Sequence, residues 1–87
     1  MYSESIIRLA RILAKKRGWT LSTLSTYATN HGAFISRLER GHDLTTRRAA
    51  RVTQWLSDHW PADLDWPADI PRPAPTPGSP AAGEDAA

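Results

Sequence analysis

The sequence predicts an all-α fold: a compact domain of four short helices, followed by a disordered tail rich in proline and alanine. Between positions 3 and 60, apolar residues recur at the three- and four-residue spacing of amphipathic helices, and they show no convincing β-strand alternation. Capping residues, glycines and one proline divide this stretch into four segments. Six of the seven prolines stand at position 67 or beyond. We therefore expect a helical domain over residues 1–66 and a tail over residues 67–87.

The first helix is expected from about Ser5 to Lys16, with Ser3 as its N-cap. Three consecutive basic residues followed by Gly18 are typical of a helix C-terminus. One face of this helix carries the apolar residues Ile6, Leu9, Ala10 and Leu13.

The second helix is expected to begin after Thr20, which is a good N-cap, and to end near Thr29. Trp19 precedes the cap and Leu24 follows it at the spacing of a hydrophobic staple. The residues Asn30-His31-Gly32 then predict a turn.

The third helix is short, from about Gly32 to Arg40, and Gly41 is its expected cap. One side of it is apolar and is expected to be buried through Phe34, Ile35 and Leu38. The other side is small or polar and carries Ala33, Ser36, Arg37 and Arg40.

The fourth helix is expected to begin after Thr45 and to run to about Trp60, where Pro61 stops it. Trp60 and Trp66 bracket a segment that is expected to fold back onto the helices, with room for a fifth, short turn. The inner stripe of the fourth helix consists of Ala49, Val52, Leu56 and Trp60.

The tail begins with Pro67 and contains almost no large apolar residue. Proline fixes its own backbone and lacks an amide hydrogen, so this run cannot continue a helix. We expect local polyproline character without a fixed structure. Deleting residues 67–87 is therefore expected to leave the melting temperature almost unchanged.

Length and composition weigh against several classes of protein. A domain this short buries only about 60% of its unfolded surface, which leaves little room for a deep catalytic cavity. The 87-residue chain has no cysteine, and its three histidines lack metal-ligand spacing. No nucleophile elbow, phosphate loop or paired-carboxylate pattern occurs. We expect a protein that is not an enzyme, with no metal, cofactor or evident small-molecule ligand.

The sequence pattern does not predict a membrane-spanning helix or a signal peptide. No run approaches the roughly 18 apolar residues of a membrane-spanning helix. The N-terminal apolar residues are interrupted by arginines, unlike those of a signal peptide. We therefore expect a cytoplasmic protein with no membrane partner.

Charge is distributed unevenly along the chain. Residues 1–57 hold ten Lys or Arg and three acids, which gives +7, whereas residues 58–87 hold one Arg and six acids, which gives −5. A basic folded part with an acidic tail is typical of nucleic-acid-binding proteins. The alternative is that these arginines are ordinary solvated surface residues.

Two short helices joined by a tight turn form a helix-turn-helix arrangement, whose second helix fits the DNA major groove. The outer face of that helix must be small or polar and basic, as it is here. The residues expected to contact bases are His31, Ala33, Ser36, Arg37 and Arg40.

The segment Ile35-Ser-Arg-Leu-Glu-Arg-Gly41 resembles the end of the recognition helix in the phage-repressor-like helix-turn-helix family (lambda repressor/Cro, XRE-type). Thr20-Leu-Ser-Thr-Leu-Ser25 is similar to the start of the family's scaffold helix, and the resemblance covers about Leu9–Leu56. Leu21 stands where the family usually has a DNA-contacting glutamine, and Thr29 where its turn usually has glycine.

This resemblance implies a sequence-specific DNA-binding transcriptional regulator, bacterial or from a prophage. It also implies double-stranded DNA as partner and a two-fold homodimer on half-sites about one DNA turn apart. A nucleoid-associated protein in the cytoplasm is expected.

Arginines begin the fourth helix, where positive charge opposes the helix dipole and an anionic partner would help. The residues expected to contact phosphate are Thr20, Thr45, Thr46, Arg47, Arg48 and Arg51.

Three alternatives stay open. The chain would be a protein-interaction adaptor or antirepressor if it keeps the fold without reading DNA. Membrane-surface binding by the basic first helix is a weaker alternative, because that helix needs its apolar stripe for the core. Trp55 falls beside the inner stripe of the fourth helix, which would suit a dimer interface as well as packing within the domain.

Overall fold

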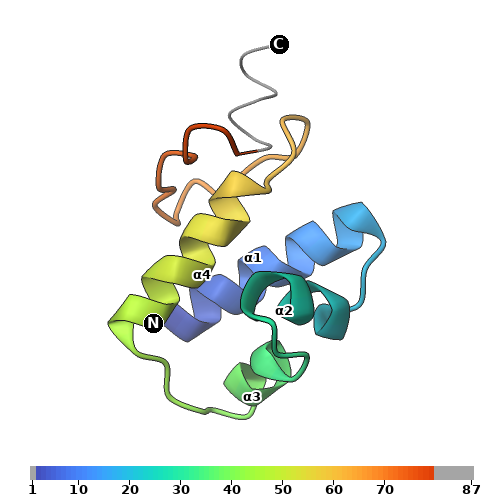
Figure 1. The fold of residues 1–87 in the computed structure, drawn as a ribbon, viewed down its shortest axis with the longest axis vertical. Helices are drawn as coiled ribbons and strands as arrows, with labels where there is room; N and C mark the ends of the chain where they lie inside the picture. Colours follow the sequence, from blue (N-terminus) through green and yellow to red (C-terminus); the bar gives the residue numbers. More distant parts are fainter. Residues whose placement is uncertain (1, 80–87) are drawn as a thin grey trace.

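The computed structural model describes residues 2–79, except for the side chain of Tyr2. This part of the chain contains α1 (Tyr2–Arg17), α2 (Leu21–Thr29), α3 (Phe34–Glu39) and α4 (Thr46–Asp58), and it contains no β-strand (Figure 1). The predicted all-α fold with four helices is confirmed over these residues. None of the four combines the length and apolarity needed to cross a bilayer.

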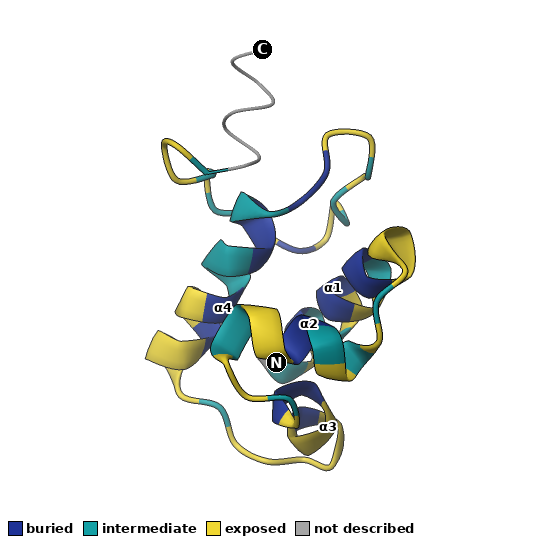
Figure 2. Cartoon of the chain, turned by 45° about the vertical axis from the view of Figure 1, so that its right-hand side comes forward, coloured by how far each residue is buried: buried dark blue, intermediate teal, exposed yellow. Residues whose placement is uncertain are grey.

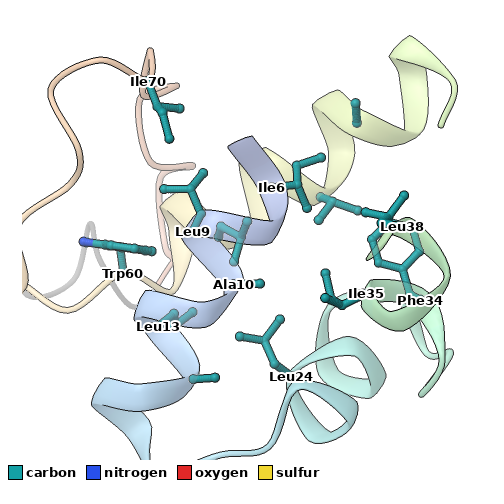
Figure 3. Close-up of a cluster of buried hydrophobic side chains, with 14 residues drawn as sticks. Ile6, Leu9, Ala10, Leu13, Leu24, Phe34, Ile35, Leu38, Trp60 and Ile70 are labelled. Atoms are coloured by element: carbon teal, nitrogen blue, oxygen red, sulfur yellow. The ribbon is translucent and has the colours of Figure 1, made fainter. Parts of the chain in front are cut away.

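The apolar stripes predicted for the helices form one core. Leu9 and Leu13 of α1 are fully buried, and so are Leu24 of α2 and Leu56 of α4. Side chains from all four helices and from the chain beyond α4 point into the same interior (Figure 3). Leu21 and Ala28, which helical spacing places on the same face of α2 as Leu24, are only partly buried. The other residues expected on the inner faces are buried: Ile6, Leu9, Ala10, Leu13, Leu24, Phe34, Ile35, Leu38, Ala49, Val52, Leu56 and Trp60.

The predicted N-cap of α2 is confirmed, and α4 has an N-cap at the residue after which it was expected to begin. The hydroxyl oxygen of Thr20 accepts a hydrogen bond from the N–H of Thr23, and that of Thr45 accepts one from the N–H of Arg48. Each cap satisfies one of the backbone donors that the first turn of a helix leaves free.

Other helix ends differ from the prediction. Ser3 lies inside α1 and is not its N-cap, because no helix breaker precedes it and the helix extends back to Tyr2. α3 begins at Phe34, since residues 31–33 belong to the turn. α4 ends at Asp58, and Trp60 joins the core from the loop that follows.

The chain folds back after α4, as predicted. The rings of Trp60 and Trp66 meet edge to face, with centroids 4.8 Å apart. The indole N–H of Trp60 donates to the carbonyl of Leu64, and that of Trp66 donates to the carbonyl of Ile70. Trp60 is buried and Trp66 is partly buried, and in each ring the one polar atom keeps a partner.

The expectation of a disordered tail does not hold for residues 67–79. Ile70 is buried in the core with 7% of its surface exposed. Beyond it, Ser57 donates to the carbonyl of Pro73, and Arg72 donates to both the hydroxyl and the carbonyl of Ser57. The burial of Ile70 and these hydrogen bonds thus hold the segment against the helices. Its composition alone would predict a segment exposed to solvent. The expected domain boundary at residue 66 falls within this packed region, and residues 80–87 lie outside the described residues.

Candidate nucleic-acid interface

α2 and α3 are joined by a tight turn over residues 30–33. Asn30 closes α2 in the left-handed region, with φ 63°, and its N–H donates to the carbonyl of Thr26. Gly32 lies so close to α2 that a Cβ there would stand 3.3 Å from the hydroxyl oxygens of Ser22 and Thr26. A residue without a side chain therefore lets the turn approach α2.

A buried hydroxyl fixes α3 against α2. Ser25 is fully buried, and its oxygen accepts a hydrogen bond from the N–H of Ile35 at 3.2 Å. The same hydroxyl donates to the carbonyl of Leu21 at 2.7 Å. Both hydrogen-bonding functions of the side chain are thus used, and one of them satisfies a free donor in the first turn of α3.

The outer face of α3 is exposed. Phe34, Ile35 and Leu38 face the core, while the other side of the helix and the loop that follows it remain open to solvent (Figure 2). All the residues predicted to contact bases lie on this exposed side: His31, Ala33, Ser36, Arg37 and Arg40.

Two of these residues also have local structural roles. His31 accepts a hydrogen bond at Nδ1 from the N–H of Ala33, at 3.2 Å, just before α3 begins. Ser36 donates its hydroxyl to the carbonyl of Ala33. Arg37 and Arg40, by contrast, use only their backbones in hydrogen bonds among the described residues. The two arginines are therefore the side chains of this face best able to reach a partner.

Arg37 and Arg48 line the same hollows at the junction of α3 and α4. Both line a hollow of about 310 Å³ beside the α3–α4 loop, together with Phe34, Leu38, His42, Asp43, Leu44 and Thr45. Both also line a second, smaller hollow with Thr29, His31 and Phe34. Two arginines thus line one concave site at the N-terminus of α4, together with the acidic Asp43, and the helix dipole adds positive potential there.

The predicted phosphate-contacting residues divide into groups. Thr45 and Arg48 lie in the site just described. Thr46 lines a different hollow, between α1 and α4. Arg47 and Arg51 are exposed and, four residues apart, share another face of α4.

Thr20 stands apart from this site, at the start of α2. Its hydroxyl accepts from the N–H of Thr23 and also donates to the hydroxyl of Thr23. Because both functions are occupied in the cap, Thr20 has less to offer a phosphate than Thr45, whose hydroxyl accepts from the N–H of Arg48 and donates to no group within residues 2–79.

Sequence reasoning missed the loop residues His42, Asp43 and Leu44, which line the hollow with the two arginines. The sequence does indicate their position. Only residues 42–44 separate Gly41 from Thr45, so this short loop joins the end of α3 to the start of α4 and keeps its residues near both helices.

The basic residues of α1 are mostly neutralised. Arg8 pairs with Asp69 at 2.7 Å, Lys16 pairs with Asp63 at 2.8 Å, and Arg11 pairs with Glu39. The hydrogen bond from Arg8 holds the pKa of Asp69 below its ordinary value, and that from Lys16 does the same for the pKa of Asp63. Of the other two basic residues of α1, Arg17 donates to the carbonyl of His59, and Lys15 has no ion pair within residues 2–79.

The arginines of α3 and α4 are not neutralised. Within residues 2–79, no ion pair or hydrogen bond engages the side chain of Arg37, Arg40, Arg47, Arg48 or Arg51. Three carboxylates, those of Glu39, Asp63 and Asp69, thus pair with α1, whereas the arginines of α3 and the first half of α4 carry charge without an ion pair.

No group of three or more His, Cys, Asp or Glu within the described part of the chain is placed to hold a metal ion. Comparisons with family models, with curated proteins and with solved structures find no match to this chain.

Proposed function

We propose that this chain is a sequence-specific DNA-binding transcriptional regulator of bacterial or prophage type. In this proposal, α2 and α3 act as a helix-turn-helix unit, α3 enters the major groove of a duplex, and the start of α4 rests on the phosphates. The observation that carries the proposal is the unequal neutralisation of charge. The arginines of α3 and α4 lack the acidic partners that three of the five basic residues of α1 have.

The geometry supports a division of roles between the two helices. Ala33 and Ser36 are small and exposed, which lets α3 approach base edges closely. Arg37 and Arg40 have the planar donor groups that recognise guanine in the major groove. Arg48, the hydroxyl of Thr45 and the N-terminal dipole of α4 suit a phosphate, which sets affinity and register but not sequence.

The proposal includes a homodimer and a location with the DNA. Two-fold dimers place two recognition helices on half-sites about one DNA turn apart, roughly 34 Å. A single copy with a six-residue α3 reads few base pairs, so a second copy would supply the rest of the specificity. A nucleoid-associated protein in the cytoplasm would have access to such sites.

Binding to mixed-sequence duplex DNA, measured at several salt concentrations, tests the proposal. We expect the logarithm of the association constant to fall linearly with the logarithm of salt concentration, by about 0.9 for each neutralised phosphate. Absence of binding at low salt, or binding that does not respond to salt, would contradict it. Selection of bound duplexes from a random pool then tests sequence preference.

A protein-interaction adaptor or antirepressor is the second candidate, and one observation favours it. Trp19, Tyr27, Trp55 and His59 line a shallow surface hollow of about 350 Å³. Tyr27 is 58% exposed, and Trp55 stacks on His59 with centroids 4.2 Å apart. Exposed aromatic side chains are enriched where proteins meet. An adaptor would show neither salt-dependent DNA binding nor sequence selection.

A further inference from the structure

A second candidate site is a hollow of about 440 Å³ that lies away from the arginines. It is bounded by α1, α4 and residues 70–73 beyond α4. Thr46 lines it whereas Arg48 does not, because two residues along a helix differ by about 200° around its axis. This hollow is therefore a separate feature from the proposed DNA interface.

Small side chains form the floor of the hollow. Ala49, Ala50 and Thr53 of α4 face Ser5 and Leu9 of α1 across it. In Figure 3 the side chain of Ile70, from the segment beyond α4, reaches towards Leu9. Because the residues between these walls are short, the space between them stays open.

The third wall is held in place by hydrogen bonds. Ser57 donates to the carbonyl of Pro73, and Gln54 donates from Nε2 to the carbonyl of Ala74 at 2.9 Å. Arg72 lies over the ring of Trp66, 5.3 Å from its centroid. The proline rings of residues 71 and 73 are thus fixed above the floor, so the hollow is largely formed before anything enters it.

The residues that line the hollow indicate what kind of molecule would bind there. Although the chain has 20 charged residues among 87, not one of the ten lining residues is charged. Polar atoms are few and lie among apolar ones. The hydroxyls of Ser5 and Thr46 make no side-chain hydrogen bond within residues 2–79, and Thr53 donates to the carbonyl of Ala49. Sites for small molecules share this pattern: a volume of about 300–1,000 Å³, mostly apolar walls and a few polar groups.

We propose that this hollow binds an uncharged, mainly apolar small molecule that carries one or two hydrogen-bonding groups. An ion would lose its hydration there without meeting a countercharge. An uncharged ring system buries its surface against Leu9, Ile70 and the two prolines, and a single polar group reaches the hydroxyls of Ser5 or Thr46. The proposal does not depend on DNA binding.

Indole is a suitable probe, because it is uncharged, mainly apolar and has one N–H. Titration into the full chain, followed by backbone amide NMR, is expected to shift the amides of Ala49, Ala50, Thr53 and Ile70 and to saturate with a dissociation constant of about 1 mM or tighter. Indole-3-acetate, which adds a carboxylate, is expected to bind at least about tenfold more weakly. Equal binding of the two probes, or the absence of saturable shifts at these amides, would overturn the proposal.

Filling the hollow provides the matched test. Ala50→Leu places a larger side chain on the floor, whereas Ala68→Leu makes the same change at an exposed position outside the hollow. We expect Ala50→Leu to weaken indole binding at least about tenfold and Ala68→Leu to leave it unchanged. If Ala50→Leu does not fold, Thr46→Leu at the edge of the hollow replaces it.

Unchanged indole binding in the filled variant would show that indole binds elsewhere and would overturn the assignment. The alternative occupant of the hollow is a second copy of the chain. Sedimentation at the concentration used for NMR would detect such a dimer. A dimer that indole dissociates and Ala50→Leu abolishes would identify this hollow as a protein interface, and that result would also overturn the small-molecule proposal.

Discussion

The buried hydroxyl of Ser25 joins α2 to α3 by accepting a hydrogen bond from the backbone N–H of Ile35. α3 has no side-chain cap of its own at its N-cap position, Ala33. A donor in the first turn of this short helix is therefore satisfied from α2, ten residues earlier in the chain. The orientation of the candidate recognition helix depends on this contact.

Replacing Ser25 by alanine should destabilise the fold by about 1–2 kcal/mol, because the N–H of Ile35 would lose its partner inside the protein. The matched control is Ser22→Ala on the same helix, where the serine is exposed and its hydroxyl makes no hydrogen bond within residues 2–79. We expect that control to change stability by less than about 0.5 kcal/mol. Denaturant unfolding of the two variants measures the difference, and equal stabilities would show that the bond contributes nothing.

The local features of the fold could be predicted from the sequence. The cap at Thr20 and the start of α4 after Thr45 are predictable because a helix N-terminus depends on residues within one helical turn. The burial of Phe34, Ile35 and Leu38 follows from helical spacing, which also leaves Arg37 exposed. The positions of the helices and the solvent-facing side of α3 can thus be predicted from the sequence.

The features that depend on distant contacts could not be predicted in this way. The sharing of one hollow by Arg37 and Arg48 depends on the path of the loop between their helices. The order of residues 67–79 depends on Ser57 and Asp58, whose hydrogen-bond partners lie 15 to 18 residues away. Composition alone indicates a solvated tail, since it does not reveal that one isoleucine finds a place in the core.

Two arginines of the candidate interface should differ in their effects on DNA binding. Arg48→Ala should weaken binding to all duplexes alike and reduce the salt slope by about one, as expected for a lost phosphate contact. Arg37→Ala should instead relax sequence preference, by about 1–3 kcal/mol at one base pair. Binding to a selected duplex and to a scrambled one, over a range of salt, separates the two effects.

Lys15→Ala is the control for charge alone, because Lys15 is exposed on α1 and has no ion pair within residues 2–79. We expect it to change the affinity less than either arginine variant. If all three variants weaken binding equally, net charge rather than a defined interface governs the interaction.

The segment beyond α4 should contribute to stability. Ile70→Ala should cost about 2–4 kcal/mol, because it removes most of a side chain that is 7% exposed in the core. Pro77→Ala, at an exposed position of the same segment, should have little effect. Thermal and denaturant unfolding check both variants. A wild-type melting temperature for Ile70→Ala would restore the interpretation of the whole segment as a solvated tail.

The attachment of this segment should also depend on pH through Asp58. Partial burial raises the pKa of Asp58, but hydrogen bonds from the N–H of Thr76, from Gln54 and from the hydroxyl of Thr76, with the nearby His59, together lower it below the ordinary 3.8. The N–H of Thr76 lies 2.7 Å from the carboxylate. A carboxylate with a lowered pKa stabilises the folded state fully above its unfolded value, and this contribution is lost as pH falls through the folded value.

The free energy of unfolding of the wild type should therefore exceed that of Asp58→Asn at pH 6, and the difference should shrink as the pH is lowered below about 4. Asp63 and Asp69 also have lowered pKa values, so the wild type alone would not isolate this group. Subtracting the variant at each pH removes their contribution, since both proteins retain them. Asp65→Asn, at an exposed carboxylate between α4 and Ile70, serves as the control.

The amide hydrogen of Thr76 should lose its protection from exchange over the same acidic range, because its acceptor becomes protonated there. A difference between wild type and Asp58→Asn that stays constant from pH 6 to pH 3 would show that the carboxylate charge does not hold this segment to α4.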